Sequence, residues 1–154
     1  MGFSLEQTLA EAYEYITPRD RTVAEVRRHL EHVGTYPELI DAAIEELAGH
    51  GYLDDVRYAR CFAEDRRNLD SWGKERIYRR LIHHGIDPEL AEQFSRSEDP
   101  EQELRAAVGL LRRRMRCPPT DPRARQKAVG ILVRRGYSWE LAYTAVIRFE
   151  EPAA

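Results

Sequence analysis

Few cysteines and no long apolar stretch set the first limits on this 154-residue sequence. Cys61 and Cys117 lie far apart and form no Cys-x-x-Cys pair, so we expect two free thiols rather than a disulfide framework or a zinc cage. No apolar run approaches the length of a membrane span, and residues 1–10 lack the basic-then-apolar order of a signal peptide. The sequence therefore predicts a cytoplasmic protein with no membrane partner.

Motifs of catalysis are missing as well. The chain has no Gly-rich phosphate loop, no Gly-x-Ser-x-Gly sequence and no nucleophile paired with a plausible base. His29, His32, His83 and His84 have no cysteine or carboxylate at a recognised ligand spacing, so we expect surface histidines. We therefore predict a non-enzymatic protein with no catalytic residue, no cofactor and no metal site.

An internal repeat is present instead. The pattern Leu, three residues, Gly, three residues, Glu-Leu begins at Leu30, Leu81 and Leu132, with a constant period of 51 residues. Three periods cover 153 residues, so we expect no separate catalytic domain. Repeat arrays of this kind usually bind other molecules.

Signals for helix ends are frequent along the chain. Ser4 with Gln7 and Thr22 with Glu25 fit capping boxes, in which each side chain satisfies a free backbone amide. Further starts are expected at Asp87-Pro88, Asp99-Pro100, Asp121-Pro122 and Ser138. Stops are expected at glycines that can adopt a left-handed conformation: Gly34, Gly51, Gly85 and Gly136.

Apolar residues recur at helical spacing between these signals, as in Val23, Val26, Leu30 and Val33, and no segment has a sustained period of two. Stripes are also expected at Ile40, Ile44 and Leu47 and at Val56, Ala59, Phe62 and Ala63. The predicted helices span residues 5–16, 23–33, 38–49, 55–68, 74–84, 88–97, 100–115, 122–135 and 139–149.

Grouped in threes, these helices give an all-α fold, an elongated array of three tandem three-helix repeats with about nine helices. The expected repeats span residues 1–53, 54–98 and 99–154. An elongated array would have a radius of gyration above the ~15 Å of a compact globule of this length. No long heptad seam is present, and we expect a monomer.

One run of residues is specific enough to suggest a family. Gly51-Tyr52-Leu53-Asp54-Asp55-Val56-Arg57-Tyr58-Ala59, with Gly73 and Gly85 further on, resembles the signature of the RecX regulatory proteins, modulators of the RecA recombinase. The resemblance covers the full chain and weakens after Pro100. It implies tandem three-helix repeats that lie along the RecA filament on single-stranded DNA and restrain ATP hydrolysis and strand exchange. It implies no catalytic residues, and the motif residues are mainly structural.

Charge is unevenly distributed, although the formal net charge is only −3. Residues 1–103 carry a net −10 and residues 104–154 a net +7. Such a basic segment would attract phosphates or an acidic protein surface, or would simply form a solvated face. The basic residues singled out here are Arg112, Arg113, Arg114, Arg123, Arg125, Lys127, Arg134 and Arg135.

The middle helices of the first two repeats carry further cations. Arg27 and Arg28 lie on the first, and Arg76, Arg79 and Arg80 share one face of the second. Arginine suits phosphates and carboxylates because its planar fork binds them bidentately. These side chains could follow a repeating polymer, or they could pair with the acidic third helices and hold the repeats together.

Other candidate residues have structural explanations. Asp54 and Asp55 precede a helical stripe and are expected to be cap and first-turn residues. Tyr52 and Tyr58 are expected to pack against the fold, whereas Trp72 is expected to be more exposed and able to stack on a base.

Two other functions remain open on the sequence. A helix-turn-helix DNA-binding protein is disfavoured because residues 38–49, the would-be recognition helix, are acidic. A plain protein–protein adaptor would use the same surfaces without a nucleoprotein.

Overall fold

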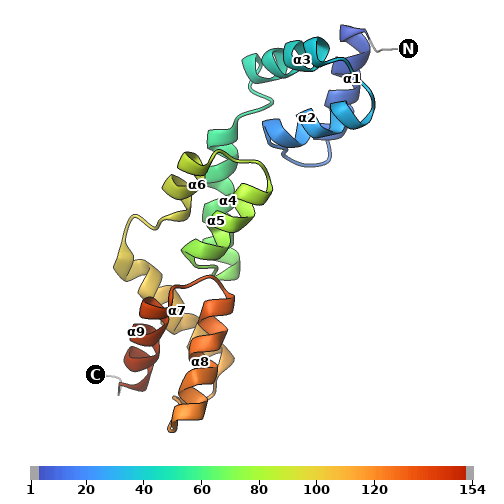
Figure 1. Cartoon of the computed structure of the whole chain (residues 1–154). Coiled ribbons are helices and arrows are strands. Elements are labelled where there is room, and N and C mark those ends of the chain that lie inside the picture. The colour runs from blue at the N-terminus through green and yellow to red at the C-terminus, as the bar shows by residue number, and fades with distance from the viewer. Residues whose placement is uncertain (1–3, 152–154) are drawn as a thin grey trace. The chain divides into compact units, whose positions relative to one another are not determined.

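The computed structural model describes residues 4–151, which form nine α-helices and no strand (Figure 1). Every observed boundary lies within two residues of its predicted position, and the all-α prediction is confirmed. The helices are α1 (Leu5–Ile16), α2 (Val23–His32), α3 (Pro37–Gly49), α4 (Asp55–Asp70), α5 (Lys74–His83), α6 (Pro88–Ser95), α7 (Pro100–Arg114), α8 (Pro122–Arg134) and α9 (Trp139–Glu150).

Local hydrogen bonds explain where these helices begin and end. Ser4 and Thr22 form the two predicted capping boxes. Asp99, Asp121 and Ser138 each accept a hydrogen bond from a backbone amide of the helix that follows. The four predicted stop glycines all have positive φ angles: Gly34 (88°), Gly51 (79°), Gly85 (86°) and Gly136 (101°).

The chain divides into two compact units. The first consists of Met1–Cys61 and Leu81–Leu90, and the second of Phe62–Arg80 and Ala91–Ala154. Helices α4, α5 and α6 contribute residues to both, so these units do not coincide with the three expected repeats. The repeat boundaries at residues 53 and 98 therefore remain a proposal.

In the first unit, α1, α2 and α3 pack around one apolar cluster. Val26 and Leu30 of α2 meet Ile40 and Leu47 of α3, and all four are at most 1% exposed. Burying each such side chain stabilises the fold by about 1.5–3 kcal/mol. The predicted stripes of α2 and α3 therefore form the core.

The stripe predicted for α4 was wrong at one position. Ala59 and Ala63 are buried and Phe62 is half-buried, but Val56 is 44% exposed. Helical periodicity identifies the inward face of a helix without showing how far a neighbouring helix covers it. Val56 lies in the first turn of α4, where its side chain stays exposed although Asp55 and Tyr58 are partly buried.

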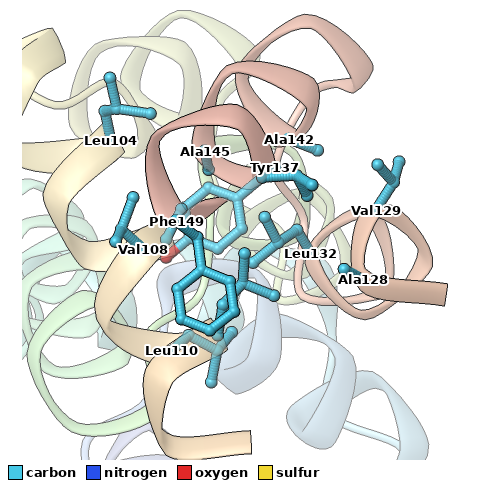
Figure 2. Packing of buried hydrophobic residues seen from close by; sticks show 13 residues of the cluster. Leu104, Val108, Leu110, Ala128, Val129, Leu132, Tyr137, Ala142, Ala145 and Phe149 are labelled. Atoms are coloured by element: carbon cyan, nitrogen blue, oxygen red, sulfur yellow. The ribbon is translucent and has the colours of Figure 1, made fainter. Parts of the chain in front are cut away.

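In the second unit, α7, α8 and α9 pack around a second cluster (Figure 2). Figure 2 shows Val108 and Leu110 of α7, Leu132 of α8 and Phe149 of α9 converging near the Tyr137 ring. Tyr137 is only 2% exposed, and its hydroxyl donates a 2.8 Å hydrogen bond to the Ser71 carbonyl oxygen. This cluster therefore connects the three-helix bundle to the turn before α5.

The same helix junction occurs once in each unit, with the 51-residue offset of the sequence repeat. In the first unit, the Thr22 hydroxyl donates to the His84 carbonyl oxygen at 2.6 Å, and the Val23 amide donates to the Asp55 carboxylate at 3.0 Å. The corresponding bonds in the second unit run from the Gly73 amide to the Arg135 carbonyl oxygen at 2.8 Å and from the Lys74 amide to the Glu103 carboxylate at 3.4 Å. The start of α2 or α5 thus contacts residues 29–62 positions further along the chain; Thr22, Val23 and His84 match Gly73, Lys74 and Arg135 at the 51-residue offset, whereas Asp55 and Glu103 are 48 apart.

The repeated glycine makes this junction possible. A Cβ added at Gly85 would lie 2.3 Å from the Ala24 Cβ, and one added at Gly136 would lie 2.4 Å from the Arg76 Cβ. A Cβ added at Gly34, the first copy, would meet no atom within 4 Å. Gly85 and Gly136 are therefore required both by their left-handed backbone and by close packing, whereas Gly34 is required only by its backbone.

Candidate nucleoprotein-binding surface

A turn between α4 and α5 gathers predicted cations from three parts of the sequence. Ser71 has a positive φ of 54° and accepts a 2.8 Å hydrogen bond from Arg113 through its hydroxyl. The Asp70 carbonyl oxygen accepts a 2.5 Å bond from Arg135. Arg76 places its guanidinium 4.2 Å from the Trp72 ring centroid. We call residues 70–73 the Ser71 turn; its contacts with α5, α7 and the end of α8 lie within the second unit.

The prediction for Trp72 was wrong, because the side chain is half-buried. Its ring packs edge-on against Phe62, with centroids 6.2 Å apart, and lies near the guanidinium groups of both Arg66 and Arg76. Cation–π contacts of this kind stabilise the turn. Trp72 therefore orders the Ser71 turn rather than offering an open stacking platform.

Several predicted cations are exposed and have no carboxylate partner among residues 4–151. They are Arg28, Arg79, Arg80, Arg112, Arg114, Arg123, Lys127 and Arg134. Charges that are not neutralised within the protein retain their full attraction for an anionic partner.

Two of the predicted cations are instead paired within the protein. Arg27 of α2 bonds Asp41 of α3 at 2.9 Å, and Arg125 of α8 bonds Glu150 of α9 at 2.6 Å. The sequence left open whether the cations hold helices together or face a polymer. For Arg27 and Arg125 the structure favours the first interpretation, and for Arg79 and Arg80 it leaves the second available.

The Gly51–Ala59 run is mainly structural. Asp54 accepts the Arg57 amide at 3.0 Å and so caps α4 as predicted. Asp55 does more than its predicted first-turn role, because it accepts the Val23 amide of α2. Burial raises the pKa of Asp55, although that hydrogen bond opposes the shift.

The aromatic residues of this run differ from each other. Tyr58 is half-buried, and its hydroxyl lies 2.5 Å from Nδ1 of His84, as expected for a packing residue. Tyr52 is 55% exposed, although its ring lies near those of Tyr13 and His50, with centroids 5.5 and 6.3 Å away, so its predicted packing role was wrong. Leu53 and Ala59 are buried.

Two of the histidines are less exposed than predicted. His29 stacks on Tyr15 at a centroid distance of 4.0 Å and lies 2.9 Å from Glu11, and His84 is half-buried beside Tyr58. The described part of the chain contains no group of three or more His, Cys, Asp or Glu side chains that could hold a metal ion. Cys61 and Cys117 are the free thiols that the sequence predicted, and the structure shows that both are exposed.

Sequence reasoning missed the Ser71 turn and the role of Tyr137. Position 137 corresponds to Thr35 and Ile86 in the other repeats, and all three are buried. That register could have indicated burial, but the bond to Ser71 joins residues 66 positions apart and has no local signal.

Each helix within residues 4–151 is too short or too polar to span a lipid bilayer.

Helical repeats with a glycine-packed junction and many exposed arginines define a tandem-repeat protein, a class whose members commonly bind partners. Comparisons with known proteins identify the family of this tandem-repeat protein. Residues 54–93 match the second three-helix domain of RecX, and residues 101–146 match the third.

Curated relatives give the same result. The chain is 32% identical over 143 residues to the regulatory protein RecX of Deinococcus radiodurans, covering 92% of this chain and 67% of that protein. It is 34% identical over 134 residues to the regulatory protein RecX of Trichlorobacter lovleyi, covering 84% and 87%. The chain belongs to the RecX family of regulatory proteins.

A solved structure supports the fold. The crystal structure of RecX from Lactobacillus salivarius matches with a TM-score of 0.83 at 20% identity, covering 95% of this chain and 96% of that one. At this identity the likeness concerns the fold, which is the predicted arrangement of three-helix repeats.

Proposed function

We propose that this chain is a non-enzymatic regulator that binds the RecA filament on single-stranded DNA and inhibits its ATP hydrolysis and strand exchange. Membership of the RecX family and the resemblance at Gly51–Ala59 support the recombinase as partner. The protein works by occupying the filament, so its own residues supply binding and no chemistry.

The single observation that carries this proposal is the set of exposed cations without carboxylate partners. Arg79 and Arg80 on α5 and Arg112 and Arg114 at the end of α7 all belong to the second unit. Guanidinium groups in this state bind phosphates and acidic side chains, both of which a nucleoprotein filament presents. Because the whole chain has a net charge of −3, we expect it to reach DNA mainly through the filament.

The decisive experiment compares three targets at several salt concentrations: RecA-coated single strands, naked single strands and duplex DNA. We expect the tightest binding to the coated strands, together with a lower DNA-dependent ATPase rate of the recombinase. Tightest binding to duplex DNA would instead support the helix-turn-helix alternative. An unchanged ATPase rate at saturating protein would contradict the proposal.

A matched pair of variants tests the surface itself. Replacing Arg79, Arg112 and Arg114 with Gln removes three unpaired charges and should weaken binding. If each contacts a phosphate, the slope of log K against log salt should fall by about 2, at about 0.7 per contact. The control replaces three paired cations, Arg96, Arg105 and Arg125, and changes the net charge equally. Equal losses in both variants would show that net charge, rather than this surface, controls binding.

A further inference from the structure

Helix α9 presents an apolar stripe to solvent. Trp139, Tyr143 and Ile147 recur at every fourth residue and are 57%, 55% and 56% exposed. The rings of Trp139 and Tyr143 lie 6.0 Å apart between centroids, so the side chains form one continuous strip. The core-facing side of α9 is separate and consists of Ala142, Ala145, Val146 and Phe149. We call the three exposed residues the α9 stripe.

The repeat register shows that the α9 stripe is a departure from the other copies. One period earlier the same positions hold Pro88, Glu92 and Arg96, and two periods earlier they hold Pro37, Asp41 and Glu45. Both earlier sets place charged side chains at the second and third positions. A scaffold role would be served equally by charged residues in α9, so the apolar residues there indicate a contact with another molecule.

A shallow hollow includes in its lining Glu140 and Thr144, the sequence neighbours of Trp139 and Tyr143. It has a volume of about 250 Å³ and is lined by Pro100, Glu101, Leu104, Glu140, Leu141 and Thr144, which belong to α7 and α9. Its lining combines the apolar Pro100, Leu104 and Leu141 with two carboxylates, of which Glu101 is paired with Arg148 and Glu140 is unpaired. The surface could therefore receive an apolar side chain and would favour cations at the border.

Nucleic acid fits this surface poorly. Proteins that stack bases on aromatic residues surround them with cations that track the backbone. The unpaired charges exposed on α9 and at its C-cap residue are Glu140 and Glu151, because Arg148 is paired with Glu101 and Glu150 with Arg125. These carboxylates would repel phosphates, so the α9 stripe calls for a protein surface.

A second copy of the chain is also a poor occupant. A fully buried aromatic side chain covers about 150–250 Å², so three half-exposed residues offer on the order of 300 Å² per copy. The sum for two copies is about half of the ~1,200 Å² that a stable interface needs. Trp and Tyr at the centre of a larger heterologous contact would instead act as anchors.

We propose that the α9 stripe docks on a recombinase subunit of the filament, on an apolar patch bordered by basic residues. This inference rests on the proposed function and assigns its protein-facing contact. Arg134, one of the exposed unpaired cations, lies shortly before Trp139 in the sequence. A filament, which presents phosphates and protein together, offers a partner for the unpaired cations and another for the α9 stripe.

The test uses the full chain with Trp139→Ala and Tyr143→Ala combined. We expect at least about tenfold weaker binding to RecA-coated single strands, with an unchanged salt slope and unchanged helical content, because the side chains are exposed anchors that carry no charge. Leu69→Ala is the matched control, since Leu69 is 73% exposed on α4, and it should bind like the wild type.

A charge reversal distinguishes a protein partner from DNA by the sign of its effect. Glu140→Lys should weaken binding if the border of the partner is basic, and it should strengthen binding if the stripe faces phosphates. Strengthened binding, an unaltered affinity of the double variant, or a wild-type dimer that the double variant converts to monomers would each overturn the proposal.

The wild-type measurement separates failure of the proposed function from failure of the α9 contact. If the wild type does not bind the filament, then the function and the partner named here fall together. If the wild type binds the filament and the stripe variants bind it equally well, the proposed function stands and the α9 contact is refuted.

Discussion

The junction at Gly85 gives the sharpest prediction about stability, because the repeat supplies its own control. Gly34 and Gly85 occupy the same repeat position and have nearly equal φ angles of 88° and 86°. An alanine at either position meets the same left-handed strain, about 1–2 kcal/mol. Only at Gly85 would the new Cβ also lie 2.3 Å from the Ala24 Cβ.

We expect Gly34→Ala to lower the free energy of unfolding by about 1–2 kcal/mol. Gly85→Ala should cost about 1–3 kcal/mol more, the usual penalty for an added methyl group in a packed site. Urea denaturation followed by circular dichroism measures both. Equal losses for Gly34→Ala and Gly85→Ala would refute the idea that the repeated glycine is required for packing.

A second substitution identifies the atom responsible. After the Ala24 Cβ, the nearest atoms to a Cβ at Gly85 are the Ala24 Cα at 3.7 Å and the Thr22 hydroxyl oxygen at 3.8 Å, both at ordinary contact distance. Ala24→Gly alone should cost about 0.5–1 kcal/mol. In the double variant the excess cost of Gly85→Ala should disappear, giving a favourable coupling of about 1–3 kcal/mol. An additive double variant would show that the strain is relieved elsewhere.

Two further predictions concern single side chains at the junctions. Burial raises the pKa of Tyr137 to about 12 from an ordinary value of 10. The unfolded chain therefore loses this proton at a lower pH than the folded chain does. The free energy of unfolding should fall as pH rises from 10 towards 12, by up to about 2–3 kcal/mol. Urea unfolding of the wild type and Tyr137→Phe should be compared between about pH 8 and pH 11, a range around the ordinary pKa of Tyr. The difference between their free energies of unfolding should shrink as the pH rises, and a constant difference would contradict the raised pKa. Thr22→Ala should lower the free energy of unfolding by about 2–4 kcal/mol, because it removes both a helix cap and the partner of the His84 carbonyl oxygen. Ser138→Ala removes only a cap and should cost about 1 kcal/mol. Thermal unfolding of the two variants checks this order, and a smaller loss for Thr22→Ala would be inconsistent with the junction bond.

Local chemistry made the helices predictable. The partners of Ser4 and Thr22 in their capping boxes lie three residues away, and the stop glycines need only their own backbone freedom. Such interactions depend on neighbours in sequence, so the helix boundaries could be placed within two residues. The family resemblance likewise rested on one contiguous run, Gly51–Ala59.

The candidate surface was less predictable, because each side chain's state depends on distant partners. Sequence alone identified Arg27 and Arg28 as equivalent, but Asp41 neutralises only Arg27. It also suggested an exposed Trp72, whereas Phe62 and Arg76 cover the ring. Composition can show that cations are abundant without showing which of them remain unpaired.

The helices, the 51-residue register and the family could all be derived from the linear sequence. The folded chain was needed to see that Gly85 is packed while Gly34 is open, since the residue against Gly85 lies 61 positions away in the chain. It also decided that Trp139 and Tyr143 face solvent while Phe149, on the same helix, enters the core. Helical periodicity ranks the faces of a helix by polarity, and an apolar residue on the outer face is recognised only when the neighbouring helices are in place.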